Sequence, residues 1–229
     1  MREASKGRRR FLDREKRSAL LLASIVLLFV LAPILEDRAT GGLLLILNLY
    51  ITLVTAAGEL SEQRTIFWIA IPIAILSMIL VLASHYNPVW ALLFANYLVL
   101  AAFLLLVSGS LFIYLGQQGQ IITRGRILVS VSLYFLLGLT WFALYNLINL
   151  VQPGSFAEAG TPLTGVAHWS TMLYFSLVTL TTLGYGDIVA VRPTARMIAT
   201  LEAAAGVLYV AITVARLVSA RGSSSESEK

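Results

Sequence analysis

The sequence has no cysteine among its 229 residues, which excludes disulfide bonds, thiol chemistry and thiolate metal sites. It has only two histidines, His85 and His168, and their spacing does not match a metal site. It also lacks a glycine-rich phosphate loop, a zinc-protease motif and a nucleophile elbow. We therefore expect neither enzyme activity nor a cofactor.

Charged residues are also scarce, since they make up 13% of a chain that is 58% hydrophobic, and they cluster between long uncharged runs. A run of about 18 apolar residues is long enough to cross a hydrocarbon core of about 30 Å as a helix. A large soluble core of buried helices would need far more polar surface than this chain supplies. The sequence predicts six membrane-spanning helices at 18–35, 41–60, 66–84, 89–115, 127–151 and 194–220.

Most of the net charge of +5 belongs to the first 17 residues, which hold eight of the seventeen lysines and arginines. Because basic segments stay on the cytoplasmic side, this segment is predicted to be cytoplasmic, and six spans return the C-terminus to the same side. Fourteen basic residues then lie inside and three outside. A cleaved signal peptide is the competing interpretation of the first span, but the run is longer than a usual signal core. The basic segment offers a surface for anionic lipid headgroups, and nucleic acid is not an expected partner.

One polar stretch, "TLTTLGYGDIVAV" at 179–191, interrupts the apolar sequence before the last predicted span. The run before it, 167–182, is apolar and helix-forming, but about fifteen residues at about 1.5 Å each reach only about 22 Å. Such a helix is too short to span the membrane. Non-helical backbone at membrane depth persists only where it is buried in protein or lines a water-filled pathway. We predict a short helix that enters from the outer side and returns as a glycine-containing strand facing an aqueous axis.

The run "TTLGYGD", between a short apolar helix and a glycine-containing span, resembles the selectivity filter of potassium channels. The resemblance covers about 127–220 and implies a homotetramer around one pore. It also implies rings of main-chain carbonyl oxygens, with the Thr182 hydroxyl as the innermost ring, that replace the water around a potassium ion. The side chains of Leu183 and Tyr185 are expected to pack against the pore helix. The implied ion-binding residues are Thr182, Leu183, Gly184, Tyr185 and Gly186.

The resemblance further implies a shell of residues that support the filter. Tyr174 and Phe175 occupy the place of an aromatic pair that braces the filter in the family, and Asp187 is expected to accept a hydrogen bond from this shell. Val178 stands where some relatives carry a buried glutamate, so an acid pair with Asp187 is not expected. The implied filter supports are Tyr174, Phe175, Val178, Thr181 and Asp187.

Two residues of the last predicted span stand out. Gly206 lies 23 residues after Leu183, as the hinge glycine of the family does. Close helix packing explains a glycine in a membrane helix equally well, so hinge and packing both stay open. Glu202 is the only acid in the interior of a predicted span, away from its ends, and an intramembrane acid is functional by default. Glu202 either faces the pore helix and filter backbone or is protonated.

The first four predicted spans form a front domain. Six spans and a pore loop resemble voltage-gated channels, whose fourth span carries an arginine at every third residue, but the fourth span here has no basic residue. We therefore expect a potassium-selective, passive channel of the cell membrane that is not strongly voltage-gated. The alternatives are a weakly selective cation channel and a transporter-type potassium subunit. Polar residues in the front domain, Asn48, Asn96 and Tyr97, are expected to form hydrogen bonds between helices.

The sequence thus predicts an all-α membrane protein of six transmembrane helices, with a re-entrant pore helix and filter between the fifth and the sixth. Its five segments are a basic cytoplasmic N-terminal segment (1–17), the front domain (18–116), a cytoplasmic linker (117–126), the pore domain (127–220) and a short, polar, disordered cytoplasmic tail (221–229).

Overall fold

The computed structural model describes residues 2–35, 41–60, 63–116, 123–164 and 169–226. Side chains are described between residues 15 and 216, except that of Arg64. Most of the expected linker, and also His168, lies outside the described residues. The other histidine, His85, lies in the last turn of a long helix.

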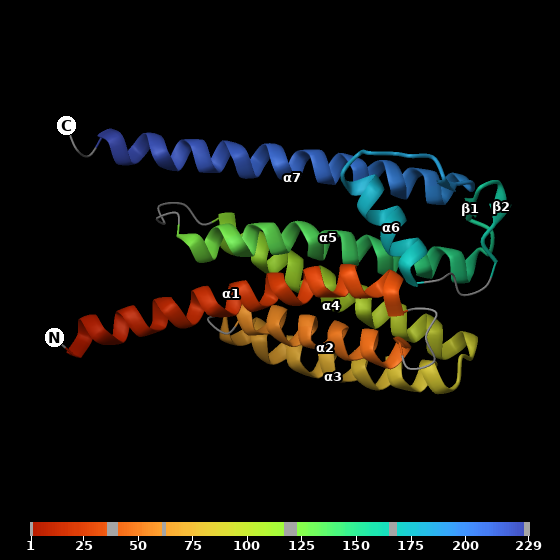
Figure 1. Cartoon of the computed structure of the whole chain (residues 1–229), viewed down its shortest axis with the longest axis horizontal. Coiled ribbons are helices and arrows are strands. Elements are labelled where there is room, and N and C mark those ends of the chain that lie inside the picture. Colours follow the sequence, from red (N-terminus) through yellow and green to blue (C-terminus); the bar gives the residue numbers. More distant parts are fainter. Residues whose placement is uncertain (1, 36–40, 61–62, 117–122, 165–168, 227–229) are drawn as a thin grey trace.

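In the described part of the chain, six long helices contain segments that are long and apolar enough to cross a membrane, as predicted. The two chain ends lie at the same end of the molecule, and a small β-sheet lies at the opposite end (Figure 1). A seventh helix, α6 (Trp169–Leu180), is short and apolar. The long helices are α1 (Arg2–Leu35), α2 (Gly41–Glu59), α3 (Arg64–Tyr86), α4 (Trp90–Gly116), α5 (Arg124–Val151) and α7 (Pro193–Glu226).

Two of the helices are longer than the hydropathy predicts. Helix α1 begins at Arg2, so the basic segment and the first span are one continuous helix. Helix α7 continues to Glu226, so the prediction of a disordered tail is wrong for residues 221–226. Extending a helix that has already formed costs far less than starting a new one, which explains how polar ends join the apolar spans.

A three-stranded antiparallel sheet, which the sequence did not predict, lies at the end of the molecule away from the chain termini. Its strands are β1 (Phe156–Glu158), β2 (Thr161–Pro162) and β3 (Ile188–Ala190), in the order β2-β1-β3. Strand β1 follows α5 and pairs with β3, which follows the predicted filter. The sheet therefore joins the segments before and after the predicted pore loop.

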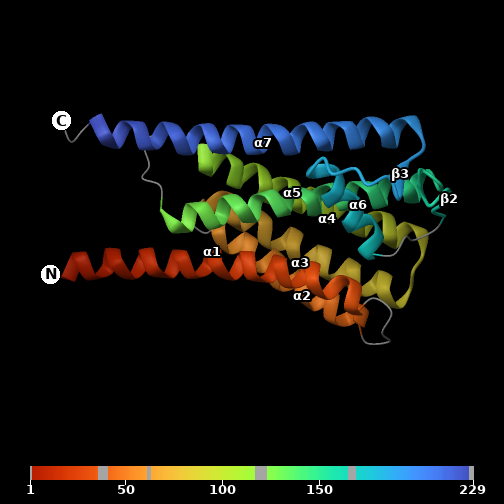
Figure 2. The same ribbon diagram turned by 45° about the horizontal axis from the view of Figure 1, so that its top comes forward.

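Helix α5 lies between two groups of helices, with α1 to α4 on one side and α6 and α7 on the other (Figures 1 and 2). The front domain packs on α5 of its own chain through aromatic side chains. The ring centroids of Phe29 and Phe135 are 5.3 Å apart, and those of Tyr97 and Phe142 are 6.4 Å apart. The Trp90 indole N–H also donates to the Leu150 carbonyl oxygen at 3.3 Å.

The hydrogen bonds expected between the front helices form only in part. Asn48, in the amide orientation that satisfies both its ends, donates to the Ser24 carbonyl oxygen of α1 at 3.0 Å. Asn96 is buried, but no described residue donates to its side-chain oxygen. The prediction is therefore wrong for Asn96, whose amide faces a cavity described below.

Candidate functional site

The candidate site is built on α6, which lies between α5 and α7 (Figure 2). Its 12 residues extend about 18 Å, which is too short to cross a membrane. One face of the helix is buried, including Met172, Phe175 and Ser176. After Leu180 the chain leaves the helical conformation and runs as an irregular strand to β3. The predicted sequence of a short helix followed by a non-helical return is therefore present.

The returning strand alternates in backbone handedness. Thr182, Gly184 and Gly186 have positive φ angles of 59°, 56° and 81°, whereas Leu183 and Tyr185 between them do not. Left-handed backbone costs a non-glycine residue about 1–2 kcal/mol, and only Thr182 bears that cost. A backbone that alternates in this way turns successive peptide groups in the same direction, with N–H groups on one side and carbonyl groups on the other.

The carbonyl oxygens of this strand are free of hydrogen bonds within the described part of the chain. No described residue donates to the carbonyl oxygens of residues 181–186. By contrast, the N–H groups at the start of the strand are held by the pore helix: Leu183 donates to the Val178 carbonyl oxygen at 2.9 Å, and Thr182 donates to that of Thr179 at 2.9 Å. The strand is thus anchored through its N–H groups while its oxygens remain available to a ligand.

The side chains of Leu183 and Tyr185 are 59% and 68% exposed in the single chain. Their own chain therefore leaves more than half of each side chain uncovered, and their packing against a pore helix stays a prediction. Large exposed side chains of this kind need a covering surface.

Asp187, directly after the strand, is held by the supporting shell as expected. The Tyr174 hydroxyl donates to Asp187 Oδ2 at 2.7 Å, and the Ile188 backbone N–H donates to Oδ1 at 3.0 Å. These hydrogen bonds lower the pKa of the Asp187 carboxyl below its usual range, and the bond from Tyr174 has the largest effect. The Asp187 carbonyl oxygen also accepts from the Ala159 N–H at 2.9 Å, which ties the end of the strand to the sheet.

The other implied supports lie on or directly after α6. Phe175 is buried in an aromatic cluster, with its ring centroid 5.0 Å from that of Tyr145 and 5.3 Å from that of Phe156. The Thr181 hydroxyl donates to the Leu177 carbonyl oxygen at 2.6 Å. Val178 is buried, and its carbonyl oxygen accepts the hydrogen bond from the Leu183 N–H. Its side chain adds only apolar packing.

Glu202 lies on α7 and places a buried carboxyl group against α6. Its side chain is fully buried, Ser176 Oγ donates to its Oε1 at 2.6 Å, and the Tyr145 hydroxyl donates to its Oε2. Its partners are therefore side chains of α6 and α5 and not the filter backbone. Ser176 Oγ also lies 2.8 Å from the Gly138 carbonyl oxygen, and its single hydrogen can serve only one of the two acceptors at a time.

Tyr145 and Ser176 were not predicted from the sequence as partners of Glu202. An acid inside a membrane span indicates that nearby helices carry hydrogen-bond donors, because a carboxyl group without a donor is costly there. The residues that meet it lie 57 and 26 positions away along the chain, however, and only the packing of three helices identifies them.

Gly206 lies where α7 passes the end of α6. A Cβ atom added at Gly206 would lie 2.0 Å from the Leu180 carbonyl oxygen, so any side chain there would push the helices apart. The same oxygen accepts from the Tyr134 hydroxyl at 3.1 Å. Of the two open interpretations of Gly206, close packing has direct support in these contacts; its role as a hinge stays a prediction.

A membrane protein in which a short apolar helix enters between two spans and returns as a strand with free, aligned carbonyl oxygens has the architecture of a pore-loop channel. Residues 130–221 match a family described as "Ion channel". They contain most of α5, all of α6, the strand from Thr182 to Gly186 and most of α7. Over this segment, which is less than half of the chain, the protein is similar to ion channels.

Three similar known proteins are potassium channels. The chain is 33% identical over 81 residues to the Shaker-related potassium channel tsha2 of Oncorhynchus mykiss, which is 35% of this chain and 17% of that protein. It is 35% identical over 97 residues to the inward rectifier potassium channel Kirbac3.1 of Paramagnetospirillum magnetotacticum, which is 42% of this chain and 27% of that protein. It is 34% identical over 80 residues to the potassium voltage-gated channel protein shk-1 of Caenorhabditis elegans, which is 35% of this chain and 15% of that protein.

The matched stretch thus spans less than a third of the length of each of these relatives. No solved structure is a significant match to the chain.

Proposed function

We propose that this protein is a subunit of a potassium-selective channel that conducts passively through the strand from Thr182 to Gly186. The observation that carries the proposal is the alternating handedness of this strand together with its unbonded carbonyl oxygens. Carbonyl oxygens can replace the hydration shell of a potassium ion without adding a fixed charge. A single strand supplies only one oxygen per ring, so the site is incomplete in one chain.

Four identical chains around one axis would complete these rings. Closed cyclic assembly is the usual form of homo-oligomers. The exposed side chains of Leu183 and Tyr185 support it, because in a tetramer they would pack against a neighbouring subunit. Apolar residues of α7 are exposed in the single chain as well, among them Met197, Leu201 and Leu208. The same assembly would place these next to neighbouring subunits or along the pore.

The orientation follows from the charge distribution. We place the protein in the cell membrane with both termini in the cytoplasm, because the end of the molecule that carries the termini also carries most of the basic residues. The sheet and the filter exit then face outward, and the basic start of α1 lies where anionic headgroups would contact it.

The proposed channel is not strongly voltage-gated. Moving one charge across 100 mV contributes about 2.3 kcal/mol, and steep gating needs several such charges in each subunit. Helix α4 carries no charged residue, and Glu59, at the inner end of α2, is buried and accepts a hydrogen bond from Ser18. Over the range from about −100 to +100 mV, we therefore propose a shallow change in open probability.

Two glycines of the same chain give a matched test of the filter. Gly184 in the filter and Gly160 in the hairpin both have positive φ, 56° and 83°, and an added Cβ meets nothing within 4 Å at either. Alanine therefore introduces the same kind of backbone strain at both. We expect Gly184→Ala to abolish potassium flux into vesicles while Gly160→Ala retains it, with equal membrane insertion of the two. Normal flux through Gly184→Ala would contradict the filter assignment.

A further inference from the structure

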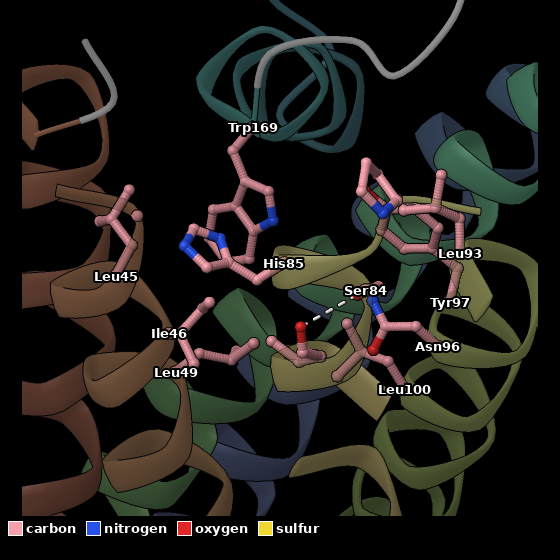
Figure 3. A pocket seen from close by; sticks show the side chains of 13 residues that line it. Leu45, Ile46, Leu49, Ser84, His85, Leu93, Asn96, Tyr97, Leu100 and Trp169 are labelled. Atoms are coloured by element: carbon pink, nitrogen blue, oxygen red, sulfur yellow. Dashed lines mark hydrogen bonds between the residues drawn. The ribbon is translucent and has the colours of Figure 1, made fainter. Parts of the chain in front are cut away.

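A cavity of about 380 Å³ lies in the front domain, between the ends of α2, α3 and α4 that face the sheet end of the molecule (Figure 3). Its size falls within the range of roughly 300–1,000 Å³ typical of small-molecule sites. The walls are mainly aliphatic, including Leu45, Leu49, Leu93 and Leu100. The exposed side chain of His85 lies at its rim.

Among the described lining residues, one fully buried polar atom lacks a hydrogen bond, the side-chain oxygen Oδ1 of Asn96. This residue is only 6% exposed, and its Oδ1 accepts no hydrogen bond from a described residue. A buried carbonyl oxygen without a donor costs about 1–3 kcal/mol. The amide extends from α4 toward the middle of the ring of lining side chains (Figure 3). The site therefore offers an acceptor to a molecule that enters it.

The remaining lining limits the chemistry of that molecule. Among the described residues that line the cavity there is no aspartate, glutamate, lysine or arginine, so a charged ligand would find no counter-charge on them. A buried water needs roughly two to four polar partners, and the nearby Ser84 hydroxyl already donates to the Val81 carbonyl oxygen at 3.0 Å. An uncharged molecule with an apolar body and one donor fits these mainly aliphatic walls.

The cavity also touches the pore domain. Trp169, the first residue of α6, lies beside His85 over the cavity (Figure 3). Its ring packs on that of Phe142 in α5, with centroids 4.7 Å apart. A molecule in the cavity would therefore contact the beginning of the helix that ends at the filter.

We propose that this cavity is a binding site for a small, uncharged amphiphile. Its apolar body lies among the leucine side chains, and its hydroxyl or N–H group donates to Asn96 Oδ1. This site is separate from the filter, so its occupancy is measurable whether or not the protein conducts potassium.

Photolabelling of the full chain in lipid vesicles tests the site. The probes are a diazirine-bearing octanol and the matched diazirine-bearing octane, and mass spectrometry maps the labelled residues. We expect octanol to label the cavity residues of α2 and α4 several-fold more than lipid-facing residues of α3. Asn96→Leu should reduce octanol labelling of the cavity roughly three- to tenfold, as expected for one hydrogen bond, and leave octane labelling unchanged.

Two phenylalanine substitutions on α2 supply the matched controls. Leu45 lines the cavity, whereas Leu47 is 58% exposed on the outside of the same helix. Leu45→Phe should remove the cavity label and Leu47→Phe should retain it, with the same helical content in both variants. Cavity labelling that is no stronger than lipid-facing labelling, or that survives Leu45→Phe, would overturn the proposal. If octanol labelling of the cavity is lost in Leu45→Phe but not in Asn96→Leu, the proposed amphiphile is wrong and the occupant is purely apolar.

Discussion

Glu202 connects three helices of the pore domain, because its oxygens accept hydrogen bonds from α5 and α6 while its backbone belongs to α7. A glutamine at this position keeps an acceptor for Tyr145 and gains an N–H group that can donate to Ser176. An alanine leaves the buried Tyr145 hydroxyl without its partner, at about 1–3 kcal/mol, whereas Ser176 can still donate to the Gly138 carbonyl oxygen. The side chain therefore matters through its hydrogen bonds more than through its charge.

We expect Glu202→Gln to melt within a few degrees of the wild type in detergent and Glu202→Ala to melt clearly lower. Leu201→Ala is the control, because Leu201 precedes Glu202 on α7 and is 54% exposed. Circular dichroism during heating measures all three variants. Equal melting temperatures for Glu202→Ala and Leu201→Ala would contradict a stabilising role for the buried carboxyl.

The pair formed by Tyr174 and Asp187 makes a prediction about pH. Because the hydrogen bond lowers the folded-state pKa of Asp187, the stabilisation is complete above the usual pKa of about 3.9 and is lost as pH falls through the lowered value. Tyr174→Phe removes the first cause of the shift, so Asp187 should then protonate at higher pH. The chain has three aspartates, so carbon-13 labelling of aspartate gives three carboxyl signals, and Asp187→Asn identifies the relevant one. Identical midpoints in wild type and Tyr174→Phe would contradict the assignment.

At the scale of elements, the crossing of α7 over the end of α6 depends on the absence of a side chain at Gly206. We expect Gly206→Ala to lower the melting temperature, because its Cβ would lie 2.0 Å from the Leu180 carbonyl oxygen. Gly109 is a matched control, since it lies inside α4 and an added Cβ meets nothing within 4 Å. Gly109→Ala should be neutral or stabilising by up to about 1 kcal/mol. Similar effects of the two substitutions would argue against close packing at Gly206.

The long helices and the pore loop could be predicted from the sequence because each depends on local information. Apolar runs of sufficient length determine the spans, and "TTLGYGD" marks the strand with its left-handed glycines. The sheet was missed because strands of two or three residues show no hydrophobic alternation. The partners of Glu202 and the unpaired amide of Asn96 depend on how distant helices pack, which a single sequence does not encode locally.

At the scale of the whole molecule, the front domain packs beside the pore domain of its own chain. We expect the same arrangement in a tetramer, without exchange between subunits. Phe29 and Phe135, whose ring centroids are 5.3 Å apart, test it through a double cysteine variant in a chain that otherwise has no cysteine. Oxidation should give a cross-link within the monomer on a denaturing gel. A ladder of covalent dimers, trimers and tetramers would indicate exchanged front domains.

The central claim is that the strand from Thr182 to Gly186 selects potassium. The most direct measurement is the reversal potential of purified protein in a planar bilayer, with a tenfold potassium gradient and an opposing tenfold sodium gradient. A potassium-selective pore reverses near the potassium equilibrium potential, about 59 mV in magnitude, and Gly184→Ala removes the current. A reversal potential near zero would indicate a weakly selective cation pore and contradict the account.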